Sequence, residues 1–161
     1  MVERYAPETP YGQSANLVLN NARNFAYESR QEFIRTDHLL AGIVQQGGCS
    51  MTLIRLRAPP LRLWPLIDKW NPCGRVSEPD RAIIGATHLL PSRAYDCIQN
   101  KYATRMTCLL NRGEVDPDCL LGGILLLEGC LGAQILHKQG ITLPLFLEEM
   151  RAYADTSPEL S

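Results

Sequence analysis

The sequence predicts an all-α protein built from two repeats of about four short helices each, related by a pseudo-twofold axis. The first observation is an internal repeat: TDHLLAGIVQQGGC at residues 36–49 and PDCLLGGILLLEGC at residues 117–130 share seven residues at matching places. Their aspartates and their cysteines are both 81 residues apart (118 − 37 and 130 − 49). The second observation is that apolar residues recur at helical spacing, and no segment alternates as a strand would. Because each half is too small to close its own core, we expect the two Leu-Leu-x-x-Ile stripes to pack together.

The first repeat is predicted over residues 11–70. Its helices are indicated by apolar residues three and four positions apart, and by residue types that favour helix ends. Ser and Thr favour the start of a helix, whereas Gly and Pro favour its end. The helices are expected over residues 14–30, 36–46, 50–57 and 61–70, with Ser14 and Thr36 as N-caps, Gly47-Gly48 ending the second and Pro59-Pro60 ending the third.

Residues 71–92, which are rich in Pro and Gly, are predicted to be a linker. The apolar stretch RAIIGATHLL inside it is expected to pack on the surface or to form a short helix. The second repeat is predicted over residues 93–153, and the two repeats together form one compact domain. Its helices are expected over residues 94–110, 117–126, 131–138 and 143–153, with Asp116 and Thr142 as N-caps, Pro117 at a first helical position, Gly140 in a left-handed C-terminal position, and Leu143, Phe146, Leu147 and Met150 facing inward.

Composition and charge narrow the classes of function. The 161 residues are 45% apolar and carry a formal net charge of −1, so no broad attraction to nucleic acid or to an anionic membrane is expected. The N-terminus has no apolar core of a secretory signal, and the longest apolar run, residues 119–127, is too short to span a bilayer. We therefore expect a soluble, cytoplasmic protein that binds neither nucleic acid nor membrane.

Motifs of common enzymes and metal sites are missing from the sequence. No Walker A loop is present to cradle phosphates, and neither G-x-S-x-G nor H-E-x-x-H occurs. The six cysteines form no C-x-x-C pair and no zinc-finger spacing with histidine, so we expect no metal, no cofactor and no disulfide framework. A cysteine and a histidine could still meet in the fold, which leaves a small cysteine-dependent enzyme as one alternative.

Two further segments and the repeat itself carry a resemblance to a known family. FIRTDHLLAGIV, residues 33–44, resembles nearly position by position the Clp repeat that forms the N-domain of Clp-family AAA+ unfoldases such as ClpA, ClpB and ClpC. VDPDCLLGGIL resembles a variant of the same motif, with Cys119 where His is usual, and GAQILHKQGITLPLFLEEM is similar to the family's third helix, Gly-hydrophobic turn and fourth helix. An alanine of the first helix, Ala22 or Ala103, precedes each aspartate by 15 residues (37 − 22 and 118 − 103).

The resemblance covers roughly residues 11–153, with departures besides Cys119. Pro59-Pro60 stands in place of the Gly-hydrophobic turn of the first repeat, and Asn100 stands where an apolar residue is expected. The resemblance implies a double Clp-N motif that is not an enzyme. Such a module binds protein substrates or adaptors in ATP-dependent proteolysis, with Clp ATPase or protease subunits as further partners. A structural accessory subunit similar to ClpT proteins is the main alternative.

The resemblance also indicates a binding site. In ClpC-type domains, acidic residues at the places of Asp37 and Asp118 help to bind phosphoarginine, which marks proteins for degradation; Thr36 and His38 are neighbouring candidates. An alternative interpretation is structural: a carboxylate in a first helical turn contributes about 0.3–1 kcal/mol through the helix dipole, Thr36 acts as a cap, and His38 packs in the core. Arg35 and Arg112 are expected to be solvated, and Trp64 and Trp70 either anchor a partner or pack in the core.

Overall fold

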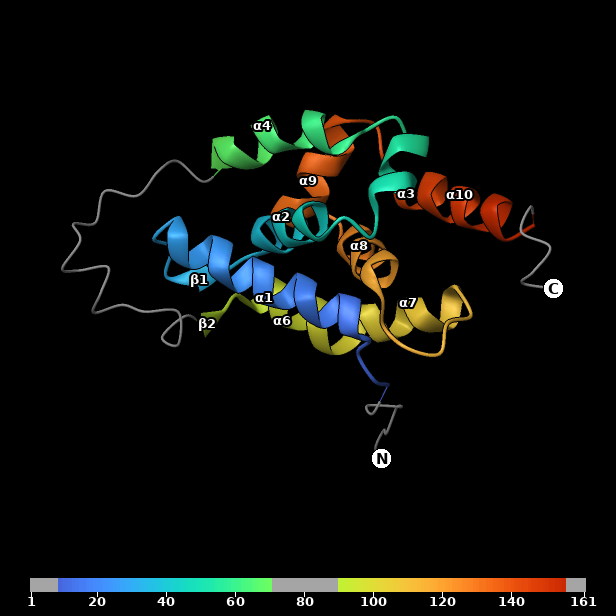
Figure 1. Cartoon of the computed structure of the whole chain (residues 1–161), viewed down its shortest axis with the longest axis horizontal. Coiled ribbons are helices and arrows are strands. Elements are labelled where there is room, and N and C mark those ends of the chain that lie inside the picture. Colours follow the sequence, from blue (N-terminus) through green and yellow to red (C-terminus); the bar gives the residue numbers. More distant parts are fainter. Residues whose placement is uncertain (1–8, 71–89, 156–161) are drawn as a thin grey trace.

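The structure is a computed structural model and describes residues 9–70 and 90–155 (Figure 1). It confirms the predicted all-α fold class, since helices make up most of the described chain. The strands found there are two short ones, β1 (Phe33–Ile34) and β2 (Leu90–Pro91), which pair in parallel. Neither was predicted, because two residues are too few to show an alternating pattern.

The helices of the first repeat fall close to their predicted positions. α1 and α2 pack closely because Gly42 has no side chain: a Cβ there would lie 2.5 Å from the backbone oxygen of Val18. Pro65 lies inside the fourth helix. The bounds are α1 Gln13–Glu28, α2 Thr36–Gln46, α3 Ser50–Arg55 and α4 Pro60–Trp70.

The first helix of the second repeat contains a π turn that the sequence pattern did not reveal. It runs as α6 (Arg93–Cys97), η2 (Ile98–Tyr102) and α7 (Ala103–Leu109). In α1 the buried Val18 and Ala22 are four residues apart, whereas the buried Ile98 and Ala103 are five apart. A π turn accommodates this extra residue, which leaves Asn100 exposed and bonded to Asp96 at 2.8 Å. The other helices are α8 Pro117–Leu126, α9 Leu131–Lys138 and α10 Leu143–Asp155.

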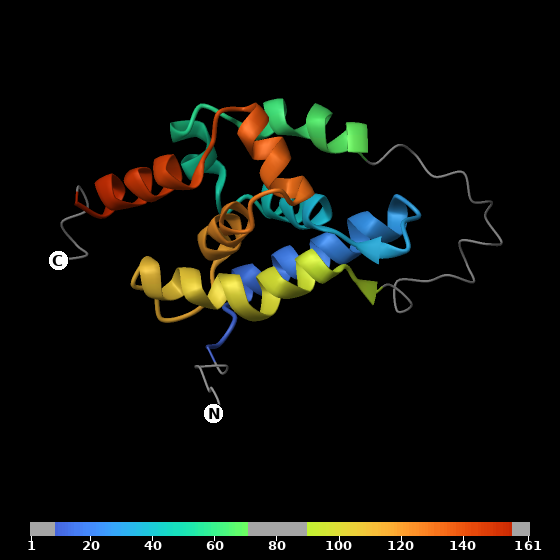
Figure 2. The same cartoon turned by 180° about the vertical axis from the view of Figure 1, so that it is seen from behind.

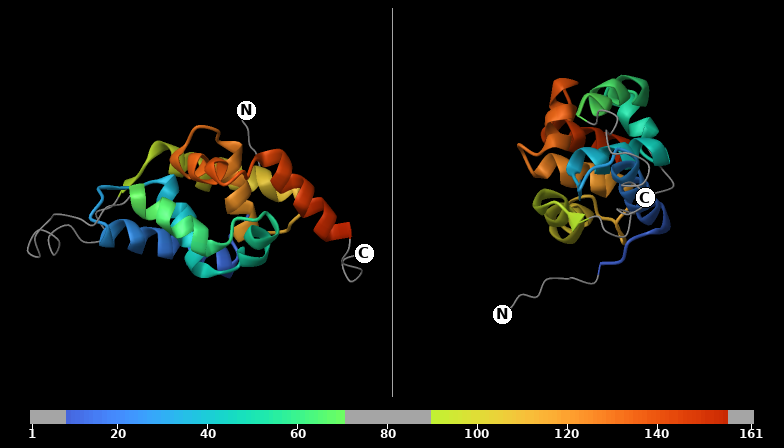
Figure 3. Two further views of the ribbon diagram at one scale, coloured as in Figure 1. Left: turned by 90° about the horizontal axis from the view of Figure 1, so that it is seen from above. Right: turned by 90° about the vertical axis from the view of Figure 1, so that its left-hand side faces the viewer.

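Each fourth helix contacts both its own repeat and the other one. α4 packs against α9, and α10 packs against α3, so each fourth helix contacts the third helix of the other repeat (Figures 1 and 2). The motif helices α2 and α8 contact each other, and α2 lies below α4 and α9 and above α6, as Figure 1 and the right-hand view of Figure 3 show. Their stripe residues Leu40, Ile43, Leu121 and Ile124 have no exposed surface, which confirms that the stripes are buried in one core.

The predicted N-caps are confirmed for α8 and α10 and are wrong for α1 and α2, whereas α3 begins at Ser50 as predicted. Asp116 caps α8 by accepting a hydrogen bond from the Cys119 N–H at 2.9 Å, with Pro117 at the first helical position. In the first repeat, Gly12 and not Ser14 precedes α1. Thr36 is the first residue of α2, because His38 Nδ1 accepts the backbone N–H of Arg35 at 2.8 Å and so takes the capping role. As predicted, Gly140 is left-handed (φ 82°), Thr142 accepts the Leu145 N–H, and Leu143, Phe146, Leu147 and Met150 belong to the core or pack against it.

The Gly-hydrophobic turn of the first repeat is present after all, at Arg57-Ala58. The N–H groups of Arg57 and Ala58 donate to the carbonyls of Ile54 and Leu53, both at 2.9 Å. Gly140-Ile141 make the same pair of bonds in the second repeat, to His137 and Leu136 at 2.9 and 3.0 Å. The prediction that Pro59-Pro60 replaces the turn is therefore wrong: Arg57 adopts φ 66° in the place of the glycine, and α4 begins at Pro60.

The predicted linker falls almost entirely outside the described residues, and so does the stretch RAIIGATHLL except for its last residue. The last three residues of the predicted linker are described: Leu90 and Pro91 form β2, and Ser92 caps α6. In the part of the chain that is described, no single helix is long and apolar enough to cross a membrane. α8 and α9 pass that test only as a pair, and the pair is bent by 94°.

Candidate functional site

The first predicted site residue, Asp37, is fully buried and ion-paired. Its two carboxylate oxygens accept hydrogen bonds from Arg35, Nε to Oδ1 at 3.0 Å and Nη2 to Oδ2 at 2.9 Å. The same guanidinium donates to Gln31 Oε1 at 2.8 Å. Such a bidentate pair fixes the plane of the guanidinium as well as its charge. A ligand could reach the Asp37 carboxylate only by displacing Arg35, whose side chain is 27% exposed.

Thr36 joins the two repeats. Its Oγ1 accepts a hydrogen bond from the backbone N–H of Gly132 at 2.8 Å, which connects the start of α2 with the start of α9. Gly132 permits this approach, because a Cβ there would lie 3.0 Å from the Thr36 carbonyl oxygen and 2.9 Å from Ile124. Thr36 is therefore a buried structural contact in this fold.

His38 is buried beside an aromatic pair. Its ring lies 5.9 Å from that of Phe25, and Phe25 lies 6.0 Å from Trp64. Trp64 packs against the core, which agrees with the core-packing interpretation of this residue. The side chain of Trp70 lies outside the described part of the structure.

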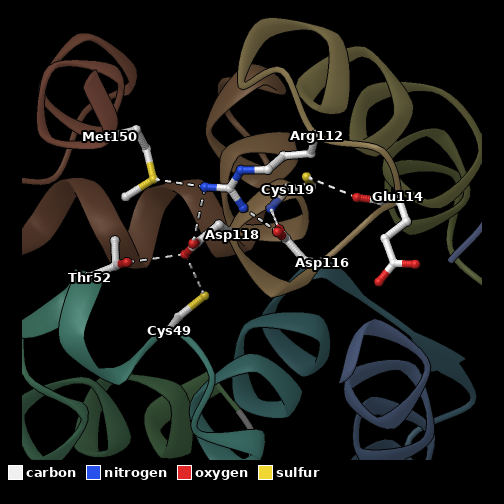
Figure 4. A network of polar contacts seen from close by, with 8 residues as sticks. All are labelled: Cys49, Thr52, Arg112, Glu114, Asp116, Asp118, Cys119 and Met150. Atoms are coloured by element: carbon white, nitrogen blue, oxygen red, sulfur yellow. Dashed lines mark hydrogen bonds and ion pairs between the residues drawn. The ribbon is translucent and has the colours of Figure 1, made fainter. Parts of the chain in front are cut away.

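Asp118 is the centre of a polar network between the repeats (Figure 4). Its Oδ1 accepts hydrogen bonds from Cys49 Sγ at 3.2 Å and Thr52 Oγ1 at 3.1 Å, both from the start of α3 in the other repeat. Its Oδ2 lies 3.8 Å from Arg112 Nη2. Arg112 also forms an ion pair with Asp116. Asp118 thus binds α8 to α3, as Thr36 binds α2 to α9.

The charge of Asp118 is opposed by burial and supported by its partners. Burial raises the pKa of this carboxyl above its ordinary value, and the negative charge of Asp116 raises it further. The hydrogen bonds from Cys49 and Thr52 and the charge of Arg112 act in the opposite direction. The side chain of Asp118 is 20% exposed and that of Arg112 is 31% exposed, so solvent reaches both groups of this pair.

Two cysteines of the network lie in surroundings that disfavour a thiolate. Burial, together with the Asp118 charge, raises the pKa of the Cys49 thiol well above its ordinary value. Burial likewise raises the pKa of Cys119 to about 12. Because the thiolate is the reactive form of cysteine, this network lacks the chemistry of a cysteine nucleophile. Over the described ranges, no three His, Cys, Asp or Glu residues are grouped so that they could hold a metal ion.

Two arginines that we expected to be solvated form ion pairs in these clusters. Arg35 precedes its aspartate by two residues and Arg112 precedes its aspartate by six, so the repeats neutralise equivalent carboxylates from different positions. The position that matches Arg35 in the second repeat, 81 residues later, is Asp116. Because an acidic residue stands there in place of a basic one, alignment of the repeats does not reveal that both aspartates have an arginine partner. The sequence did hold a signal for these ion pairs, because an arginine precedes each aspartate by a few residues.

Comparison with solved structures identifies the fold. A chain from preliminary structural investigations of a malarial protein secretion system is 16% identical, with a TM-score of 0.75, and the match covers 94% of this chain and 99% of that chain. The N-terminal domain of ClpD, a caseinolytic protease associated chaperone from Arabidopsis thaliana, is 12% identical, with a TM-score of 0.68 and coverage of 96% and 99%. The Hsp104 N-terminal domain from Candida albicans is 14% identical, with a TM-score of 0.65 and coverage of 88% and 89%.

Sequence comparison alone gives no relative: no protein-family model matches the chain, and no curated protein matches its sequence. The structural matches nevertheless extend over nearly the whole of each domain. They confirm the resemblance that the repeated motif suggested. The chain has the fold of a Clp N-terminal domain, an all-α double repeat.

Proposed function

We propose that this chain is a non-catalytic protein-binding module of the Clp systems for ATP-dependent proteolysis and protein remodelling, and that it docks substrates or adaptors. The observation that supports this proposal is the near-complete match to the N-terminal domain of a caseinolytic protease associated chaperone, over 96% of this chain and 99% of that one. The raised pKa values of Cys49 and Cys119 also disfavour these two thiols as nucleophiles of the cysteine-dependent alternative.

Within this proposal the ligand contacts Asp118 and Arg112. These two side chains form a carboxylate and a guanidinium that are both accessible to solvent. Phosphoarginine offers the complementary chemistry, because its guanidino N–H groups can donate to a carboxylate while its phosphoryl oxygens accept from a guanidinium. Thr36, Asp37 and His38 support the site by holding the junction between the repeats, since these three side chains are buried and bond within the chain.

The experiment is a titration of two forms of one permanently unfolded model protein, arginine-phosphorylated and unmodified. Fluorescence anisotropy would measure the binding of each form to the wild-type chain and to Asp118→Asn. The proposal predicts that the wild type binds the phosphorylated form more tightly and that Asp118→Asn loses this preference. Binding of both forms with equal affinity would refute the phosphoarginine contact, and no binding of either would contradict the protein-binding role. Asp68→Asn, an exposed aspartate on α4, is the matched control.

A further inference from the structure

The groove between α3 and α10 shares none of its lining residues with the Asp118 network, although the same two helices contribute to both. It is a cavity of about 370 Å³, lined by two arginines at the end of α3 and just beyond it, two glutamates of α10, and three apolar side chains. We infer that it docks a peptide that carries an apolar, an acidic and a basic side chain close together. This inference rests on the proposed protein-binding function and names a second contact surface for it.

The floor of the groove is apolar. Leu56 is almost fully buried beneath it, whereas Leu145 at the start of α10 remains 41% exposed. Ala152 continues the floor along the same helix. An apolar side chain of a partner would remove Leu145 from water, which is the ordinary source of affinity at a protein interface.

The charges of the groove are only partly paired. Arg55 and Glu149 face each other across it, Nε to Oε2 at 3.7 Å. Arg57 and Glu148 line the same groove and form no ion pair with any residue that the structure describes. This cation and this anion line the groove together with its apolar residues, so the complementary partner carries an acidic side chain for Arg57 and a basic one for Glu148.

The backbone of Arg57 is left-handed at the turn that brings its side chain to the groove. Its φ of 66° lies in the left-handed region, which costs free energy for any residue with a Cβ. The second repeat places Gly140 at the same point of the turn, with φ 82°. Arg30 also has a positive φ, so a left-handed backbone alone does not indicate a binding residue. Arg57 differs because its strained position brings its guanidinium to a groove, where no described residue forms an ion pair with it.

The test uses short labelled peptides with one Leu, one Glu and one Lys at varied spacing, together with the same peptides with Glu and Lys exchanged. Fluorescence anisotropy measures their affinity for the wild-type chain, Arg57→Gly and Glu148→Gln. Each variant is expected to weaken the best peptide by about threefold to fivefold, the contribution of an exposed ion pair. Arg57→Gly is informative because glycine fits the turn, so the variant is expected to fold, and thermal unfolding checks this before a loss of binding is interpreted. Arg62→Gln, an exposed arginine of α4 outside the groove, is the control and should bind as the wild type does.

A double variant with reversed charges, Arg57→Glu/Glu148→Lys, completes the test. It is expected to prefer the peptides in which Glu and Lys are exchanged. The inference is overturned if no peptide binds the wild-type chain, or if Arg57→Gly and Glu148→Gln bind as tightly as the wild type. In that case binding of the unfolded model protein to the wild-type chain and to Asp118→Asn still decides the proposed function separately.

Discussion

The hydroxyl of Thr36 accepts the backbone N–H of Gly132 at 2.8 Å, and this bond joins the starts of two helices that belong to different repeats. The two residues are 96 positions apart in the chain. Together with the hydrogen bonds of Asp118 to Cys49 and Thr52, it makes the motif helices α2 and α8 the bridges between the repeats. Thr36 and Asp118, from the two copies of the motif, therefore both make structural contacts between the repeats.

Thr36→Val is expected to destabilise the fold. Valine has nearly the shape of threonine but cannot accept the Gly132 N–H, and a buried donor without a partner costs about 1–3 kcal/mol. Urea denaturation monitored by circular dichroism would measure the change in the free energy of unfolding. Thr104→Val, a half-buried threonine of α7, is the control. Equal losses in the two variants would show that the bond to Gly132 contributes nothing specific.

Gly42→Ala is expected to separate α1 from α2. The added Cβ would lie 2.5 Å from the Val18 carbonyl oxygen, which belongs to rigid helix backbone. Overpacking of this kind costs roughly 1–3 kcal/mol or more. Gly113→Ala is the matched control, because a Cβ at Gly113 meets nothing within 4 Å. Thermal unfolding of both variants would decide the matter, and a Gly42→Ala protein as stable as Gly113→Ala would contradict the close packing.

Asp37→Asn is expected to weaken the fold more than Asp118→Asn does. The Asp37 carboxylate is fully buried and holds both nitrogens of Arg35, whereas Asp118 remains partly in contact with solvent. Removal of one partner from a fully buried pair costs about 3–5 kcal/mol, and the partial exposure of Arg35 lowers the expected loss to roughly 1–3 kcal/mol. Denaturation curves of the two variants provide the comparison, and the reverse order of stability would contradict the assignment of Asp37 as a structural residue.

The free energy of unfolding is expected to depend on pH through Asp118. Because the pKa of this carboxyl is raised in the folded state, its contribution to stability is fully present below the ordinary carboxyl value of 3.8 and is lost as pH rises through the folded value. Asp118→Asn should remove this dependence. The difference in unfolding free energy between wild type and variant, measured from acid to neutral pH, should therefore shift against the wild type as pH rises above 3.8. A constant difference would show that the folded pKa is not raised.

Arg57→Gly and Gly140→Ala are expected to act in opposite directions. Glycine at Arg57 relieves a left-handed conformation, so the fold should be as stable as the wild type or more stable, by up to about 1 kcal/mol. Alanine at Gly140 introduces the same strain and should cost about 1 kcal/mol. Thermal unfolding of the two variants tests the equivalence of the two turns. A loss of stability in Arg57→Gly would show that the arginine side chain supports the turn.

Much of the fold could be predicted because the decisive residues are local. Asp116-Pro117, Gly140 and the two Leu-Leu-x-x-Ile stripes specify helix ends and buried faces by short-range rules. The π turn near Asn100 could not be predicted, since an inserted residue looks like a broken periodicity. The turn at Arg57 was missed because glycine is the usual signal for such a turn, and here arginine takes the left-handed position. The pairing of Arg35 and Arg112 depends on packing between elements, which no local pattern records.

The most direct test of the protein-binding role is quantitative affinity capture from the native cell lysate, with the wild-type chain and Asp118→Asn as baits. We predict that the wild-type chain retains Clp ATPase subunits, adaptors or diverse client proteins, and that Asp118→Asn retains markedly less of them. A fixed set of protease subunits retained equally on both baits would favour the accessory role similar to ClpT. If neither bait retained any Clp component or client, the fold would be shared without the function, and the proposed protein-binding role would be contradicted.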